Sequence, residues 1–284
     1  MIAEKPVVVG VDGSTAALDA VRWGAAVAAD LGAPLVLGTA VSASAFGDNP
    51  VTPDDDVRRI LDVAEQAARD SVDDRRSNGT NIRITTETHH GTPAGVLVER
   101  SASASLIVVG TRGLGEFTGG LSASVSTAVA THAECAVAVV PSTTRAPGPI
   151  VVGVDGTENS VAALTFAFRM ASSRQVELVA VHAWSDVDIP GERHDRWTHT
   201  SAGEEAALSE TLAGWSQDYP DVTVRRIVVR DRPVRELVAR SADASLVVVG
   251  RRGRGGFTSL LLGSTSRAVL HSVDVPVVVV PTVH

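Results

Sequence analysis

The sequence of 284 residues contains one lysine, one cysteine and few aromatic residues. Because Lys5 is the single lysine and lies in no Gly-Lys-Ser/Thr motif, the sequence excludes a P-loop and leaves no lysine for an active site. Cys135 has no partner for an internal disulfide, and its apolar run CAVAVV favours an inert core thiol. Aromatic residues make up 4% and apolar residues 44%, so the core must be built from valine, alanine and leucine.

The sequence also lacks a long apolar run. No stretch approaches the length of a membrane span, and the early run VVVGVD is interrupted by Asp12, so it does not fit a signal-peptide core. We therefore expect a cytoplasmic protein without membrane insertion. The formal net charge of −8 argues against a nucleic-acid binder, because phosphate binding needs a surplus of positive surface.

What the sequence does contain is a duplication. The segment that begins at Pro6 (PVVVGVDGS) matches the one at Pro149 (PIVVGVDGT), and residues 101–141 match residues 241–281 without a gap. The segment STTRAPG (residues 142–148) has the polar, proline and glycine content of a short linker. The sequence therefore predicts two domains, residues 1–142 and 149–284.

Valine-rich runs alternate with segments of helical period in both halves. Because these runs are apolar on both faces and separated by helices, they predict an α/β fold with two tandem, doubly wound, Rossmann-like domains, each with a five-stranded parallel sheet. Ser14 and Thr157 are placed to cap the first helices, and Gly32 to end one. The expected strands are residues 7–11, 35–40, 82–86, 106–110 and 136–140, then 150–154, 177–182, 222–228, 246–250 and 275–280.

The unusual residues follow the first and fourth strands of each half. Asp12 and Asp155 come directly after the first strands, and the glycine loops GTRGLG (110–115) and GRRGRG (250–255) follow the fourth. In an open parallel sheet, ligands bind at the carboxyl ends of the strands, where the winding order reverses. A carboxylate there can accept hydrogen bonds from ribose, and a glycine loop with a helix N-terminus can bind phosphate. The order of these motifs along the chain predicts that a nucleotide binds across the carboxyl ends of the strands.

These motifs resemble the ATP-binding class of universal stress proteins. The resemblance is carried by the opening VVVGVDGS and by the spacing of Gly250, Gly253 and Gly263-Ser264, and it covers both halves of the chain. It implies that each half holds ATP, with or without Mg²⁺, at the positions that match the family's motif. In the second half these are Gly153, Asp155, Ala183, Val249, Gly250, Gly253, Gly263, Ser264 and Thr265, with Arg252 as an added anion contact. In the first half they are Gly10, Asp12, Ala40, Val109, Gly110, Gly113, Ser124 and Val125.

The two halves differ where phosphate would bind. Ala123 stands at the position of Gly263, and if that position needs a positive φ, an alanine costs roughly 1 kcal/mol or more. The arginines Arg251, Arg252 and Arg254 of the second half are matched by Thr111, Arg112 and Leu114 in the first. We therefore expect tighter ATP binding at the second site. The alternatives are that each aspartate is only a turn or cap residue and that the arginines form a solvated loop.

The resemblance implies a nucleotide-dependent stress or regulatory protein rather than an enzyme. Three alternatives stay open: a slow ATP hydrolase, a cyclic-AMP binder, and an interaction scaffold with a vestigial first site. We predict no catalytic residue, because the glycine loop of the second half offers arginines and hydroxyls but no carboxylate. We also predict no metal site, because the pairs His89–His90 and His194–His199 lack a third ligand at a suitable spacing. His182 fits either the rim of the nucleotide site or a satisfied core histidine.

The fifth strands, CAVAVVP and VPVVVVP, predict how the halves associate. They are apolar and would be exposed edges in isolated domains, so they must be covered or paired. The resemblance implies that the two domains pair through them within one chain. A homodimer of the whole chain is a further option.

Overall fold

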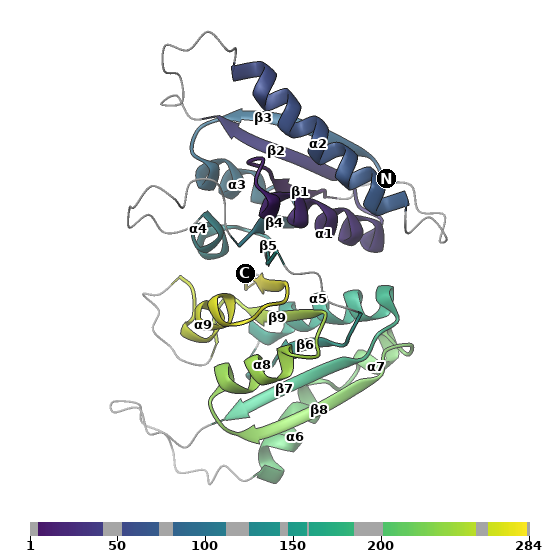
Figure 1. Cartoon of the computed structure of the whole chain (residues 1–284). Coiled ribbons are helices and arrows are strands. Elements are labelled where there is room, and N and C mark those ends of the chain that lie inside the picture. The colour runs from purple at the N-terminus through teal and green to yellow at the C-terminus, as the bar shows by residue number, and fades with distance from the viewer. Residues whose placement is uncertain are drawn as a thin grey trace. The chain divides into compact units, whose positions relative to one another are not determined.

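The computed structural model describes residues 5–41, 53–73, 82–111, 125–142, 147–157, 159–184, 201–253 and 261–282 (Figure 1). The chain divides into two compact units, residues 1–144 and 145–284, which we call unit 1 and unit 2. No helix in these ranges combines the length and the apolar content needed to cross a membrane.

Unit 1 is a parallel sheet with helices on both faces. Its sheet has the order β3-β2-β1-β4-β5, so the chain winds outward from β1 in one direction and then returns to continue in the other. Helices α1 and α2 lie on one face, and α3 and α4 lie on the other (Figure 1). The elements are β1 (Val7–Gly10), α1 (Thr15–Leu31), β2 (Leu35–Val41), α2 (Pro53–Asp73), β3 (Ile84–His90), α3 (Pro93–Ser101), β4 (Leu106–Gly110), α4 (Val125–His132) and β5 (Ala136–Val140).

Unit 2 repeats this topology with the parallel order β10-β9-β6-β7-β8. The prediction of two doubly wound, five-stranded parallel domains is confirmed. The elements are β6 (Ile150–Gly153), α5 (Asn159–Arg174), β7 (Leu178–Trp184), α6 (Ser201–Thr211), α7 (Trp215–Asp218), β8 (Val224–Arg230), α8 (Pro233–Ser241), β9 (Leu246–Gly250), α9 (Ser264–Ser272) and β10 (Val277–Val280).

Two predicted strands lie further along the chain than expected. The third strand of unit 1 is Ile84–His90 instead of 82–86, and that of unit 2 is Val224–Arg230 instead of 222–228. Each pairs on one side only, β3 with β2 and β8 with β7, and most residues of both strands are exposed or half-buried. Because the hydrogen bonds of such an edge strand can continue through polar residues, apolar patterning does not locate its end.

The caps of α1 follow the prediction. The Ser14 hydroxyl accepts a hydrogen bond from Ala17 N (3.1 Å), and Gly32 ends the helix in the left-handed conformation with φ of 68°. Thr157 makes a contact other than the predicted helix cap. The Thr157 hydroxyl donates a hydrogen bond to Asp155 Oδ1 (2.7 Å), and α5 begins at Asn159. In unit 2, the hydrogen bonds of the turn after β6 therefore converge on Asp155.

A small aromatic cluster packs against the core of unit 2. Phe168 on α5 is buried, and its ring stacks against Trp215 of α7 at 4.9 Å and against Tyr219 at 5.5 Å between ring centroids. These contacts attach the short helix α7 to α5. In a chain with 4% aromatic residues, three of them therefore stack together at one place.

The Cys135 thiol precedes β5 and is partly buried. Burial raises the pKa of this thiol to about 11, which agrees with the expectation of an inert thiol because the thiolate is the reactive form. At pH 7.5 we expect iodoacetamide to alkylate the folded protein at least about a hundredfold more slowly than the urea-unfolded chain, whose cysteine titrates near pH 8.5. The rate should rise as the pH approaches 11. Equal rates in the folded and unfolded protein would contradict this assignment.

Candidate functional site

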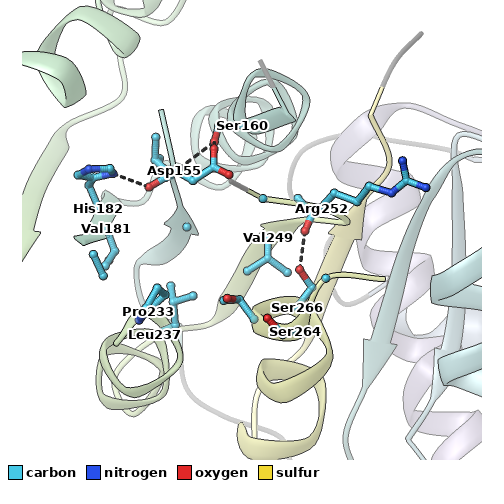
Figure 2. Close-up of a pocket in the computed structure, with 17 residues that line it drawn as sticks. Asp155, Ser160, Val181, His182, Pro233, Leu237, Val249, Arg252, Ser264 and Ser266 are labelled. Atoms are coloured by element: carbon cyan, nitrogen blue, oxygen red, sulfur yellow. Dashed lines mark hydrogen bonds between the residues drawn. The ribbon is translucent and has the colours of Figure 1, made fainter. Parts of the chain in front are cut away.

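Unit 2 contains a cavity of about 210 Å³ at the carboxyl ends of β6, β7 and β9 (Figure 2). All ten positions predicted in the second half line it: Gly153, Asp155, Ala183, Val249, Gly250, Arg252, Gly253, Gly263, Ser264 and Thr265. The cavity lies where the winding order reverses between β6 and β9, which is the usual location of ligand sites in such sheets. The structure thus brings these residues together, and nucleotide binding by them stays a prediction.

Asp155 is held in a fixed orientation at one side of the cavity. Its Oδ1 accepts hydrogen bonds from Thr157 N (3.0 Å), the Thr157 hydroxyl (2.7 Å) and the Ser160 hydroxyl (2.6 Å). The Asp155 backbone N also donates to the Ser160 hydroxyl oxygen (2.9 Å). These bonds use one carboxylate oxygen and leave Oδ2 as the acceptor available to a ligand among the described contacts.

Two glycines allow the backbone to approach closely beside this carboxylate. A Cβ atom at Gly253 would lie 2.9 Å from Asp155 Oδ2, and one at Gly263 would lie 3.2 Å from the Arg251 carbonyl oxygen. Gly263 has a φ of −63°, so the condition of a positive φ is not met there. An alanine at Gly263 would therefore crowd the Arg251 carbonyl without straining its own backbone. Ala123 lies outside the described residues.

The N-terminus of α9 forms the opposite side of the cavity. Gly263 is the N-cap and offers no capping side chain, while the Ser266 hydroxyl donates to the Gly250 carbonyl (2.6 Å). The first turn carries no acidic residue, and its first intrahelical bond runs from Arg267 N to Gly263 O (2.9 Å). The N–H groups of Ser264 and Thr265 therefore precede the helical ladder, where an anion can accept from them.

The remaining wall is apolar and includes residues that the sequence did not single out. Val181, Pro233 and Leu237 line the cavity beside Val249, and a Cβ at Gly153 would lie 3.3 Å from Leu237 Cδ1. Pro233 and Leu237 belong to α8. The sequence places α8 after the third strand, but its contact with the first strand depends on how the helix packs on the sheet, so no local signal identifies these residues.

The arginine side chain predicted as an anion contact points away from the cavity. Arg252 contributes to the lining, but Figure 2 shows its guanidinium extending to the other side of the loop. Burial lowers the pKa of the neighbouring Arg251, and the charge of Arg252 acts in the same direction. Arg254 lies outside the described residues. Among the described residues, backbone amides and hydroxyls rather than the Arg252 guanidinium therefore face the cavity.

Comparison with known sequences decides the family. The model of the universal stress protein family matches residues 4–141 and again residues 148–281. The chain belongs to the universal stress protein family. Two universal stress proteins of Mycobacterium tuberculosis are similar to it. The first is 42% identical over 286 residues, and the alignment covers 96% of that protein. The second is 40% identical over 289 residues, and the alignment covers 95% of that protein. Each alignment covers 96% of this chain.

A solved structure shows the same fold in another member of the family. The universal stress protein from Archaeoglobus fulgidus has a TM-score of 0.63 and 18% sequence identity, and the match covers 98% of this chain and 96% of that one. At this identity the comparison concerns the fold alone.

In unit 1 of this universal stress protein, six of the eight predicted positions are described. Asp12 Oδ1 accepts from Ser14 N (3.0 Å) and from the Ser14 hydroxyl (2.6 Å), which reproduces the Thr157 contacts of Asp155. A Cβ at Gly110 would lie 2.8 Å from the backbone oxygen of Ala16 on α1. Gly10 ends β1, Ala40 lies on β2, Val109 and Gly110 end β4, and Val125 begins α4, whereas Gly113 and Ser124 lie outside the described residues.

Of the histidines considered as metal ligands, His89 has another described contact. His89 Nε2 lies 3.0 Å from Glu87 Oε2, and this carboxylate also accepts from Arg100 (2.8 Å). Within the described ranges, no cluster of three or more histidine, cysteine, aspartate or glutamate residues could hold a metal ion. His194 and His199 lie outside these ranges.

Proposed function

We propose that this universal stress protein is a regulatory protein that binds ATP in the cavity of unit 2. The observation that supports this proposal is the convergence of Asp155, the Gly250–Gly253 loop and the N-terminus of α9 on one cavity. A carboxylate acceptor, an apolar wall and a turn of unpaired amides correspond to the three parts of a nucleotide: sugar, base and phosphates.

Each part of the nucleotide has a matching group in this proposal. Asp155 Oδ2 accepts from a ribose hydroxyl, because Oδ1 is already saturated by donors. The base lies against Ala183, Val249 and Leu237. The phosphates receive hydrogen bonds from the first-turn amides of α9, where the helix dipole favours negative charge.

The groups around the cavity support binding without efficient turnover. ATP hydrolysis needs a residue that orients water beside the terminal phosphate. Asp155 is turned toward the sugar in this proposal, and His182 uses both ring nitrogens in protein contacts. Asp155 is also the one carboxylate among the described lining residues, so a Mg²⁺ ion would be held mainly by the phosphates themselves.

The proposal is tested by identifying the small molecules that the purified protein carries. We expect mass spectrometry of the denatured, freshly purified chain to release intact ATP rather than ADP. Because Arg252 points away from the cavity, its charge gives ATP no advantage over cyclic AMP, so competition between the two ligands by calorimetry is needed as well. Recovery of cyclic AMP, or tighter binding of it, would favour that alternative, and no binding of either would contradict the proposal.

Pairing of the two units through β5 and β10, a homodimer and a cytoplasmic location are compatible with this function and stay predictions.

A further inference from the structure

A buried histidine–glutamate pair lies at the wall of the cavity, where His182 is a lining residue and Glu204 contacts it from behind. His182 on β7 is 2% exposed and Glu204 on α6 is 5% exposed. His182 Nε2 lies 2.6 Å from Glu204 Oε2, and His182 Nδ1 lies 2.8 Å from the Val154 carbonyl oxygen (Figure 2 shows the latter contact). The pair therefore connects a helix to the residue that precedes Asp155.

The chemistry of these two contacts determines the tautomer. A carbonyl oxygen can only accept, so Nδ1 must carry a hydrogen and donate to Val154. One proton then lies between Nε2 and Glu204, either on the imidazole or on the carboxyl group, and the pair has no net charge in either form. In both forms the bond to Val154 is the same. Glu204 thus fixes the ring orientation while Nδ1–H makes the contact that reaches the site.

Both backbone polar groups of Val154 form hydrogen bonds with β7. Its N–H donates to the Val181 carbonyl (2.9 Å), and its carbonyl accepts from His182. The next residue, Asp155, is held from α5 by Ser160. The direction of Asp155 Oδ2 therefore depends on two anchors, and without the His182 bond the Val154–Asp155 peptide could rotate.

We propose that His182, oriented by Glu204, is a positioning residue for the nucleotide site of unit 2, because it fixes the peptide that aims Asp155 into the cavity. This inference rests on the proposed ATP-binding function for its affinity readout. Unit 1 has Thr39 at the equivalent strand position, since Leu35 and Leu178 pair with the equivalent residues Val7 and Ile150. A threonine hydroxyl is a single polar atom, whereas the imidazole presents two nitrogens on different sides of its ring and can reach a carbonyl and a helix at once.

Two substitutions separate the roles of the two ring nitrogens. An asparagine amide can replace Nδ1–H as the donor to Val154, whereas the longer glutamine amide occupies the place of Nε2. Both are made in a Glu204→Gln background, so that no buried carboxylate loses its partner. Glu204→Gln alone preserves the contacts, because neutral His182 can donate through Nδ1 and accept from the glutamine amide.

We expect His182→Gln in this background to weaken ATP binding at unit 2 about tenfold, and His182→Asn to restore most of the affinity. Thr39→Val in unit 1 is the matched control and should leave binding at unit 2 unchanged. Equal affinities of the asparagine and glutamine variants would overturn the inference. Calorimetric titration with ATP, after thermal unfolding has verified that each variant is folded, provides the measurement.

A readout without ligand separates this inference from the proposed function. In the unliganded protein we expect amide hydrogen exchange at Asp155 and Thr157 to be about tenfold faster in the glutamine variant than in the asparagine variant. Nitrogen NMR of the wild-type ring should show a protonated Nδ1, and an unprotonated Nδ1 would overturn the inference even if a variant failed to fold. If wild-type protein does not bind ATP while these signals are as expected, only the proposed function is refuted.

Discussion

Replacing Asp155 by alanine is expected to weaken ATP binding about 10- to 100-fold, while replacing Asp12 should change the tightest binding less than about threefold. The expected loss corresponds to a hydrogen bond between a charged acceptor and ribose, which contributes about 1.5–3 kcal/mol. Asp155 is expected to make the larger contribution because unit 2 has Gly263, where a Cβ would lie 3.2 Å from the Arg251 carbonyl oxygen, whereas unit 1 has Ala123 at the matching sequence position. Calorimetric titration of both variants measures the difference.

Folding must be checked in the same experiment, because Asp155 also organises the turn before α5. Asp155→Asn is the suitable companion variant, since it retains one oxygen that can accept from Thr157 and Ser160. A loss of affinity in Asp155→Ala accompanied by wild-type thermal unfolding would assign the effect to the ligand. Equal losses from the two alanine variants, or a larger loss from Asp12→Ala, would contradict the expected ranking of the sites.

Phe168→Ala should lower the free energy of unfolding of unit 2 by about 3–5 kcal/mol. The ring is 1% exposed and is covered by Trp215 and Tyr219, so its removal leaves a cavity and releases α7 from α5. The destabilised helix α5 also carries Ser160, which lines the cavity. Urea denaturation followed by tryptophan fluorescence measures the change, and Trp215 reports directly on the altered contact.

Phe166 on the same helix provides the matched control. It is only half-buried, so Phe166→Ala makes the same chemical change with less buried area lost, and we expect a cost of about 1–2 kcal/mol. Similar costs for the two variants would show that the aromatic cluster has no special role in stability.

The fold and one side of the site could be predicted from the sequence because both depend on local patterns that occur twice. Valine-rich runs give the buried strands, and the repeated GVDG turn and glycine loops place Asp155 and Gly253 at strand ends. The chain's own duplication provides the alignment that a single copy lacks. The edge strands β3 and β8 were misplaced because their polar ends form hydrogen bonds without burying apolar side chains.

The site residues that sequence analysis did not predict make contacts with residues far away in the sequence. Leu237 reaches the cavity only because α8 packs against β6, and Glu204 reaches His182 only because α6 packs on the sheet at β8, beside β7. Neither contact follows from a motif. The direction of the Arg252 side chain is likewise decided by the loop conformation, so a cluster of arginines in the sequence could not reveal which way its charges point.

The close approach at Gly110 affects how such sequences should be read. A methyl group there would collide with the backbone of α1, so folding alone requires a glycine at this position, whether or not a ligand binds. A repeat that has ceased to bind would still display part of the fingerprint. Searches for family members that bind a ligand should therefore give little weight to glycines packed between a strand and a helix. They should give more weight to glycines whose substitution leaves the fold intact.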